Sequence, residues 1–281
     1  MGTEEQNQHS GGELEEQSQH SDGDLEEQSR HPDGKLTVTE RTRHPGGELR
    51  VTDRTRHRRL REQGSTSVAD LDAVLRAGFV CHLAVVVDGA PMAVPTVYGV
   101  DVAARTLYVH GSVAGRSLVR APDATVCVTV THVDGLVLAR SVFEHGLNYR
   151  SAMVYGTPRL ITHRSDPEAL LHGLRVLSEQ SAPGQWDYAR RPSPKELAAT
   201  CLLALPLDEA SVKVAAGPPE DGDGPDAELG LWAGVIPMRT AYGTPEPDPA
   251  LPGDVPLPGH IEAMSSVHSA HSLRLTSHHA N

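Results

Sequence analysis

The stretch TLYVHGSVAGRSL, Thr106–Leu118, is an alternating β-type run that meets two glycines and then a short helix-forming segment. It places an imidazole (His110), a hydroxyl (Ser112) and a guanidinium (Arg116) around one turn. Free backbone N–H groups at a helix start and the planar fork of an arginine both suit a phosphate group. We therefore predict a phosphate-binding turn here. The alternative is an ordinary strand–helix turn, because many such turns have a similar composition.

β-rich runs lie on both sides of this turn. Asp88-Gly89 and Asp134-Gly135 are dipeptides typical of tight hairpin turns. Many short strands with few long helices between them predict a closed antiparallel sheet. The expected strands are Val80–Val87, Met92–Val100, Thr106–Gly111, Thr125–His132, Leu136–Ser141, Ser151–Ile161, Leu202–Leu205 and Leu231–Ile236.

Two helices are expected at the edges of this sheet. Val68–Ala77 follows Ser67, a plausible N-cap, and its leucines and valines recur on one face. A second helix is expected after Ser165, where leucines again recur at helical spacing. The leucines of this second helix are Leu170, Leu174 and Leu177.

Composition narrows the class of protein. The 281 residues carry a formal net charge of −12, which disfavours nucleic acid and anionic membranes as partners. The chain has no apolar run of membrane-spanning length and no apolar signal segment, so we expect a cytoplasmic protein. Cys81, Cys127 and Cys201 are few, far apart and embedded in apolar runs, which predicts reduced buried thiols and no metal site.

The two ends differ from the middle. An eleven-residue unit repeats from Glu4 to Leu36, and looser copies follow as far as Leu60. Glycine or proline interrupts nearly every unit, and a single leucine per unit cannot form a continuous apolar stripe. We therefore predict a disordered tail over 1–53, one domain over 54–261, and a disordered His-rich tail over 262–281. The regularly spaced histidines of both tails are expected to be solvated.

Several separated blocks, in this order, resemble the pyridoxamine 5'-phosphate oxidase-like superfamily. The most similar branch is the bacterial one that contains the nitroimidazole-resistance reductases. The resemblance covers roughly three quarters of the chain, from about Arg54 to Ile261. Its blocks are Val94–Tyr98, Leu107–Ser112, Gly115-Arg116, Val133–Ser141 and Asn148–Ser151.

The resemblance implies a mainly β fold with peripheral helices, an FMN-binding split β-barrel. It also implies a homodimer that holds the flavin at the subunit interface, where a small-molecule substrate would enter. The residues that it assigns to the cofactor are Pro95, Thr96, Val97, Tyr98, His110, Gly111, Ser112, Arg116, Ser117, Arg140, Ser141, Asn148, Tyr149, Arg150, Ser151, Trp186 and Lys213.

Two of these residues and one neighbouring segment carry specific expectations. His110 matches a histidine that faces the cofactor pocket in nitroimidazole reductases, so it could move protons or be only a hydrogen-bonded structural residue. Arg140 lies in an apolar run and needs a phosphate or an interface carboxylate as partner. The chain departs from its relatives at His145-Gly146-Leu147, where they carry His-Ser-Met, and this loss of a serine puts one polar contact in doubt.

Trp186 and Lys213 also match the family, which implies that either could close the pocket from the partner subunit. The alternatives are core packing for the tryptophan and a solvated strand-edge position for the lysine.

The resemblance also bears on the reaction. The chain lacks the Arg-x-His-x-Arg signature of true pyridoxamine phosphate oxidases, so oxidation of vitamin B6 is not expected. An FMN-dependent oxidoreductase acting on a small, possibly nitroaromatic, compound is the first hypothesis. The alternative is a non-catalytic FMN-binding protein, or a haem-binding variant that uses His110 or His145. A DNA-associated regulator using the Arg41–Arg61 stretch is disfavoured, because acidic residues dilute its charge.

Overall fold

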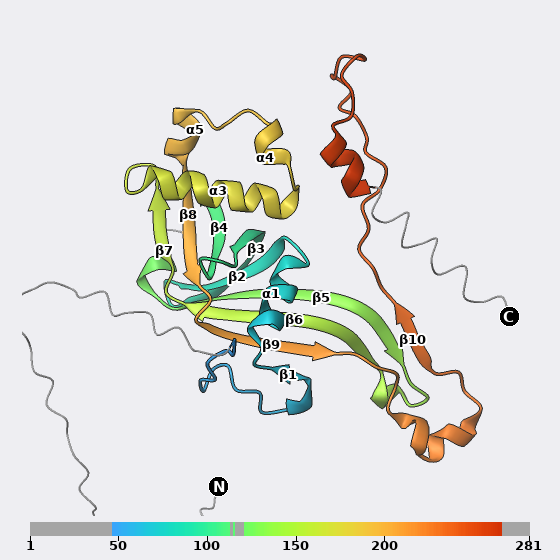
Figure 1. The fold of residues 1–281 in the computed structure, drawn as a ribbon. Coiled ribbons are helices and arrows are strands. Elements are labelled where there is room, and N and C mark those ends of the chain that lie inside the picture. The colour runs from blue at the N-terminus through green and yellow to red at the C-terminus, as the bar shows by residue number, and fades with distance from the viewer. Residues whose placement is uncertain (1–46, 113–114, 116–120, 266–281) are drawn as a thin grey trace, which may run out of the picture. The chain divides into compact units, whose positions relative to one another are not determined.

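The computed structural model describes residues 47–112, 115 and 121–265 (Figure 1). Residues 1–46 of the tail predicted over 1–53, residues 266–281 of the tail predicted over 262–281, and the predicted site residues Arg116 and Ser117 lie outside this part. Within it the fold is mainly antiparallel β, as predicted. The strands are β1 (Gly64–Ser65), β2 (Val80–Val87), β3 (Ala90–Asp101), β4 (Thr106–Ser112), β5 (Val126–Leu138), β6 (Gly146–Gly156), β7 (Arg159–Thr162), β8 (Thr200–Pro206), β9 (Glu209–Ala215) and β10 (Gly234–Pro237).

Short helices connect or cover these strands. Most are a single turn or two, and α3 is the long one. The α-helices are α1 (Val68–Arg76), α3 (Pro167–Ser181), α4 (Gln185–Tyr188) and α5 (Pro194–Ala199), and the 3-10 turns are η1 (Arg61–Gln63), η2 (Ala121–Asp123), η3 (Val142–Glu144), η4 (Asp221–Asp223) and η5 (Pro225–Leu229).

The strands form one antiparallel sheet in the order β1-β9-β6-β5-β2-β3-β4-β8-β7. The long strand β5 pairs with β6 along one edge. Along its other edge it pairs with β2 near its start and with β10 near its end. The β5–β6 pair and β10 therefore extend beyond the part of the sheet that carries α3 (Figure 1).

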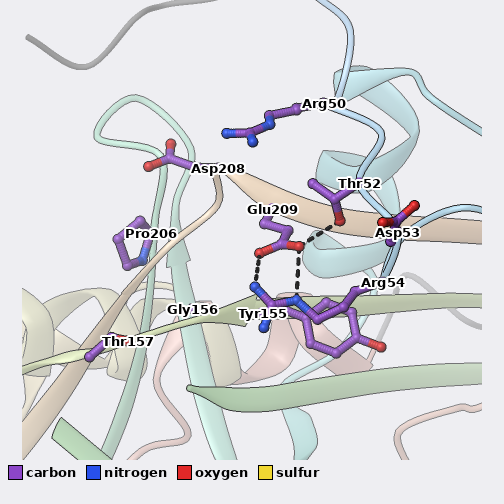
Figure 2. A pocket seen from close by; sticks show the side chains of 10 residues that line it. All are labelled: Arg50, Thr52, Asp53, Arg54, Tyr155, Gly156, Thr157, Pro206, Asp208 and Glu209. Atoms are coloured by element: carbon purple, nitrogen blue, oxygen red, sulfur yellow. Dashed lines mark hydrogen bonds and ion pairs between the residues drawn. The ribbon is translucent and has the colours of Figure 1, made fainter. Parts of the chain in front are cut away.

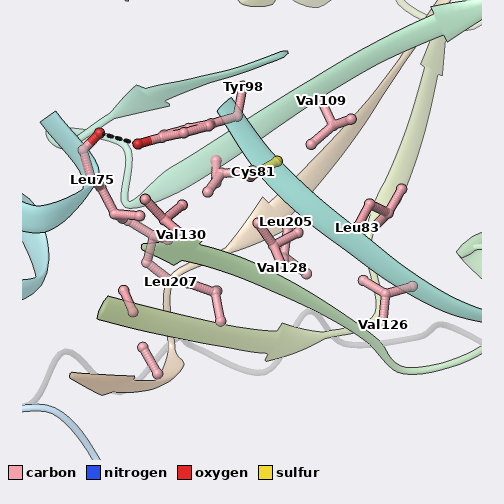
Figure 3. Close-up of a cluster of buried hydrophobic side chains, with 14 of the residues drawn as sticks. Leu75, Cys81, Leu83, Tyr98, Val109, Val126, Val128, Val130, Leu205 and Leu207 are labelled. Atoms are coloured by element: carbon pink, nitrogen blue, oxygen red, sulfur yellow. Dashed lines mark hydrogen bonds between the residues drawn. The ribbon is translucent and has the colours of Figure 1, made fainter. Parts of the chain in front are cut away.

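The inner face of the sheet encloses the main core. Its side chains come from β2, β3, β4, β5, β6, β8 and β9, and α1 adds Leu71, Val74 and Leu75. Valines and leucines alternate along these strands, which places every second side chain on this face. Figure 3 shows Tyr98 lying among them, with its hydroxyl donating to the carbonyl oxygen of Leu75 at 2.6 Å. Burial raises the pKa of the Tyr98 hydroxyl, so it stays protonated and remains a donor.

We predict that Tyr98→Phe lowers the free energy of unfolding by about 1 kcal/mol, the net value of one hydrogen bond. The loss is limited because Gln180 Nε2 also donates to the Leu75 carbonyl, at 2.9 Å. Urea denaturation of both proteins measures the difference. A loss well above 2 kcal/mol would show that the hydroxyl does more than bond Leu75.

A second apolar cluster lies on the outer face, beneath α3. Tyr108, Leu202 and Ala204 point outward from β4 and β8, and Leu170 and Leu177 of α3 cover them. Helix α3 begins after Asp166, whose carboxylate accepts from the Ala169 N–H at 3.0 Å. The helix covers only the β3-β4-β8-β7 half of this outer face, so the other half stays open.

Some expected elements agree closely with the structure. Strand β2 has the predicted bounds, and α1 is capped by Ser67, which accepts from the Asp70 N–H at 3.3 Å. Asp88 and Gly89 turn the β2–β3 hairpin with φ values of 52° and 80°, as a two-residue hairpin turn requires. Of the three thiols, Cys81 and Cys201 are buried and Cys127 is half-buried, and all are free.

Three local predictions were wrong. Asp134-Gly135 is not a hairpin turn but a bulge inside β5, where the register with β6 shifts between Val133 and Gly135. The predicted strand Ser151–Ile161 is broken after Gly156, because Pro158 cannot continue the ladder, and residues 159–162 form β7 on β8 instead. The cap of α3 is Asp166 and not Ser165, which bonds to Thr162.

The structure also describes residues just beyond both predicted domain limits. Leu49 is buried in the core, and its N–H donates to the Thr66 carbonyl at 2.6 Å. At the other end residues 259–265 are helical. In the part of the chain that is described, no helix has the length and apolar character needed to cross a membrane.

Candidate functional site: the open half of the outer sheet face

Strand alternation divides the predicted β3 residues between the two faces of the sheet. Thr96 and Tyr98 point inward, and Tyr98 is fully buried. Pro95 and Val97 point outward, and Val97 packs at the margin of the cluster under α3. Of these side chains, only Pro95 and Val97 can therefore contact a ligand on the outer face, whereas the other two present backbone groups.

Two rows of outward side chains cross the open half of this face. Pro95 is the register partner of His82, and Thr129 is the partner of both His82 and Met153. The next row runs from Thr131 through Ser151 to Lys213. The Lys213 ammonium donates to the Arg59 carbonyl at 3.5 Å, which holds it along the edge of the sheet. The rows bring three hydroxyls, an ammonium and an imidazole onto one surface.

The end of β4 lies beside this surface. His110 is the register partner of Leu202, which lies on the outer face, and the imidazole is exposed. Gly111 and Ser112 complete the strand, and the Ser112 carbonyl accepts from the Gly115 N–H at 2.9 Å. The next predicted site residues, Arg116 and Ser117, fall outside the described residues.

Arg140 finds its partner within its own chain. Its guanidinium donates to Asp221 at 3.0 Å, and the same carboxylate accepts from the backbone N–H groups of Arg140 and Ser141 at 2.5 and 3.1 Å. The Ser141 hydroxyl caps η3 by accepting from Phe143 at 3.2 Å. The observed partner is therefore a carboxylate of the same chain, whereas the expected partner was a phosphate or an interface carboxylate. Arg140 and Ser141 both hold the hairpin tip in this chain.

The Asn148–Ser151 segment of β6 also divides between faces. Tyr149 and Ser151 point to the outer face, whereas Asn148 and Arg150 point away from it. Arg150 makes two hydrogen bonds of 2.8 Å to Asp134, which lower the pKa of that carboxyl below its ordinary value. The Asn148 amide donates to the Gly217 carbonyl at 3.1 Å.

Trp186 lies on α4, beyond the end of α3. Its backbone N–H donates to the Glu179 carboxylate at 3.0 Å, and the Arg191 guanidinium stacks 4.6 Å from its ring centroid. Within one chain these contacts do not join Trp186 to the rows of the open face. The other family-matched residue, Lys213, does lie on that face.

Large apolar side chains on the open half face solvent in the single chain. Val80 is 51% exposed and Met153 is 38% exposed. Several exposed apolar side chains on one sheet face are typical of an interaction or ligand site. The open-face side chains exposed in this way are Val80, Val86, Val133, Leu136, Leu147 and Met153. The sequence prediction missed His82, Thr129, Thr131 and Met153, although the alternation of their strands carries the signal.

A pocket of about 570 Å³ opens at one end of this face (Figure 2). Its floor is Glu209 of β9, which accepts from Arg54 at 2.8 and 3.1 Å and from the Thr52 hydroxyl at 2.6 Å. The Arg54 guanidinium lies 5.8 Å from the centroid of the Tyr155 ring. The remaining lining residues are Arg50, Asp53, Gly156, Thr157, Pro206 and Asp208.

This clamp predicts a pH-dependent contribution to stability. The hydrogen bond from Arg54 lowers the pKa of Glu209 below its ordinary value. The stabilisation is therefore full above about pH 4.5 and is lost as the pH falls through the lowered pKa. We expect Glu209→Gln to destabilise the protein by on the order of 1 kcal/mol at pH 7. The difference should shrink below pH 4 in urea titrations, and a difference independent of pH would contradict the clamp.

Comparison with known proteins identifies the family to which the chain belongs. The family model described as pyridoxamine 5'-phosphate oxidase matches residues 67–214, and the chain belongs to that family. Its fold is shared by solved structures. A search of curated proteins gave no match.

The structure of the flavocytochrome Anf3 from Azotobacter vinelandii is 36% identical to this chain, with a TM-score of 0.71, and the match covers 76% of this chain and 97% of that one. The FAD- and haem-binding protein from Mycobacterium smegmatis is 37% identical, with a TM-score of 0.67, over 72% of this chain and 97% of that one. A protein described as a 5-nitroimidazole antibiotic resistance protein, from Bacteroides thetaiotaomicron, is 21% identical, with a TM-score of 0.44, over 54% of this chain and 86% of that one.

Proposed function

We propose that this protein is an FMN-dependent oxidoreductase that works as a homodimer and holds its flavin on the open half of the outer face. The observation that carries the proposal is that face itself. A chain of a flavin-binding family leaves apolar side chains, hydroxyls and an ammonium uncovered on one surface. An isolated chain exposes this surface to water, whereas two copies packed face to face would bury it.

The residues present fit the chemical demands of a flavin. The isoalloxazine ring needs an apolar wall, for which Pro95 and Val80 are placed, and hydrogen-bond donors for its polar edge. Thr131, Ser151 and Lys213 supply such donors from one row of the sheet. For the phosphate, the sequence offers Arg116 and Ser117 in the turn after Ser112.

The protein's own part in the reaction is binding, orientation and proton supply. Flavin, when bound, supplies hydride and single-electron transfer. His110 is exposed beside the face, so its imidazole is available to exchange a proton with a reduced substrate. We propose a small aromatic or nitro compound as the substrate. The free thiols of the described residues support a reducing, cytoplasmic location.

Absorbance spectroscopy of the purified protein tests the proposal. We expect paired flavin bands that bleach when NADPH is added without oxygen and return when a nitroaromatic compound follows. Bands that persist through both additions would favour a non-catalytic flavin carrier.

The phosphate assignment has its own test. Arg116→Ala should weaken flavin binding by about 2 kcal/mol, roughly thirtyfold, because a charge-assisted phosphate contact is lost. Flavin titration by fluorescence quenching measures the change. Equal affinity in the variant would remove Arg116 from the site and leave the rest of the assignment to be tested at the open face.

Haem binding is a second candidate function. The observation that favours it is that both similar structures above 35% identity are named for haem as well as flavin, and this chain spans 97% of each. His82 and His110 are exposed imidazoles on or beside the open face, and imidazole is a common axial ligand of haem iron. His145 has one ring nitrogen 3.1 Å from the Ala139 carbonyl.

A Soret band after reconstitution with haemin would support this second function. Single replacements of His82, His110 and His145 by alanine would then identify the axial ligand. A protein that takes up flavin and shows no Soret band would limit the function to flavin chemistry.

A further inference from the structure

The tip of the β5–β6 hairpin presents apolar side chains to solvent in a fixed arrangement. Phe143 is 90% exposed and Val142 is 81% exposed, both within η3. The Asp221 side chain ties the base of this tip to η4 through its bonds to the Arg140 guanidinium and to two backbone N–H groups. An exposed phenylalanine held on a clamped turn has the features of an interface anchor.

The segment after β9 adds to this surface. Leu229, Leu231 and Trp232 follow η4, and the indole of Trp232 is 68% exposed. We call residues 218–232 together with η3 the acidic lobe. Residues 214–238 contain no lysine or arginine. Asp221 is paired with Arg140. The other five carboxylates of the lobe, four in residues 218–232 and one in η3, have no ion-pair partner among the described residues. These five carboxylates are Glu144, Glu220, Asp223, Asp226 and Glu228.

The same chain carries a surface of opposite charge. Residues 56–61, which we call the basic strip, contain four exposed arginines and the half-exposed Leu60. Arg58, Arg59 and Arg61 have no ion-pair partner among the described residues. No ion pair joins the strip to the lobe within the described part of one chain. The unpaired charges of each surface can therefore pair with opposite charges on another molecule.

Both surfaces border the open half of the outer face. Lys213 of that face donates to the Arg59 carbonyl, which places the strip at its β9 edge. The lobe follows the outward-facing Leu136 and Leu147, at the far end of the long β5–β6 hairpin (Figure 1). Two copies packed through this face would therefore bring a strip and a lobe to the margins of the same interface.

We propose that the acidic lobe of one copy docks on the basic strip of a second copy, with Phe143 and Trp232 packed against the aliphatic surface around Leu60. In a two-fold dimer this contact occurs twice. The proposal rests on the dimer of the proposed function and adds the residues that set its strength and salt dependence. Apolar anchors surrounded by charges of complementary sign are the usual anatomy of such an interface.

A charge-swap experiment on the full-length protein tests the proposal by sedimentation equilibrium at low ionic strength. The lobe variant carries Glu220→Lys, Asp223→Lys and Glu228→Lys, and the strip variant carries Arg58→Glu, Arg59→Glu and Arg61→Glu. We expect each to raise the dimer dissociation constant at least tenfold. The six changes combined should bring it back to within about threefold of the wild-type value.

The control for the lobe variant carries Glu168→Lys, Glu246→Lys and Asp254→Lys, which change the net charge by the same amount as the lobe variant at exposed positions elsewhere. Lobe and strip variants that dimerise as well as this control would overturn the proposal. So would weakened variants that the combination fails to restore. Phe143→Ser should weaken the dimer at least tenfold without changing the circular dichroism spectrum.

Flavin content, measured on the same samples, separates the two proposals. A flavin-loaded dimer whose dissociation constant is unchanged by the charge reversals would support the proposed function and reject the lobe–strip contact. A wild-type protein that is monomeric and takes up no flavin would reject both.

Discussion

Replacing Val80 and Met153 together by glutamate should convert the protein into a monomer that has lost most of its flavin. Both side chains lie on the open half of the outer face, and both are already partly exposed in the single chain. We therefore expect the substitution to leave the fold of one chain intact, whereas in the proposed dimer it would place unpaired carboxylates inside the interface.

The expected size of this effect is large. An uncompensated buried charge costs about 3–5 kcal/mol, so the dimer dissociation constant should rise by more than about a hundredfold. Analytical ultracentrifugation and flavin absorbance measure the two outcomes on one sample. Leu171→Glu, on the exposed side of α3, is the control and should change neither. A double variant that remains a flavin-loaded dimer would show that the interface lies elsewhere.

Gly99→Ala should give the largest loss of stability among single methyl additions. Gly99 lies on β3 directly beneath α3, where an added Cβ would stand 2.8 Å from the backbone Cα and N of Leu177 and from the Val176 carbonyl oxygen. Backbone atoms cannot rotate away as a side-chain end can, so the helix must shift from the sheet. We expect a loss of about 2–3 kcal/mol in the free energy of unfolding.

Two further glycines provide the comparison. At Gly173 the added Cβ would meet only the side chains of Leu202 and Tyr108, which can move, so Gly173→Ala should cost less. Nothing lies within 4 Å of the position at Gly146, and Gly146→Ala should be close to neutral. Urea denaturation of the three variants gives the order directly. Equal losses at Gly99 and Gly146 would contradict the close packing of α3 on β3.

The sequence predicted the local elements well where one residue type decides the geometry. The alternation over Val80–Val87, the cap at Ser67 and the turn at Asp88-Gly89 each depend on short-range sterics and hydrogen bonds. Asp134-Gly135 misled the same reasoning, because a bulge and a hairpin turn favour similar residues. Its true conformation depends on Arg150, sixteen residues away, which holds the Asp134 carboxylate.

The site depends more strongly on long-range pairing. The family resemblance selected Pro95, Ser151 and Lys213, and the structure brings them to one face. The resemblance could not show that Tyr98, Asn148 and Arg150 point to the other face of the sheet, because the face of each side chain follows from the pleat of the paired strands. The partner of Arg140 is eighty-one residues away and the partner of Arg54 is one hundred and fifty-five away, and neither can be read from local pattern.

The central claim is that two copies of this chain enclose flavin against the open half of the outer face. The most direct measurement is the molar mass of the purified protein by ultracentrifugation, recorded at the flavin absorbance maximum. The account predicts one species with twice the mass of a single chain that carries the flavin signal. Flavin sedimenting with a single chain, or a protein that stays colourless after incubation with FMN, would contradict it.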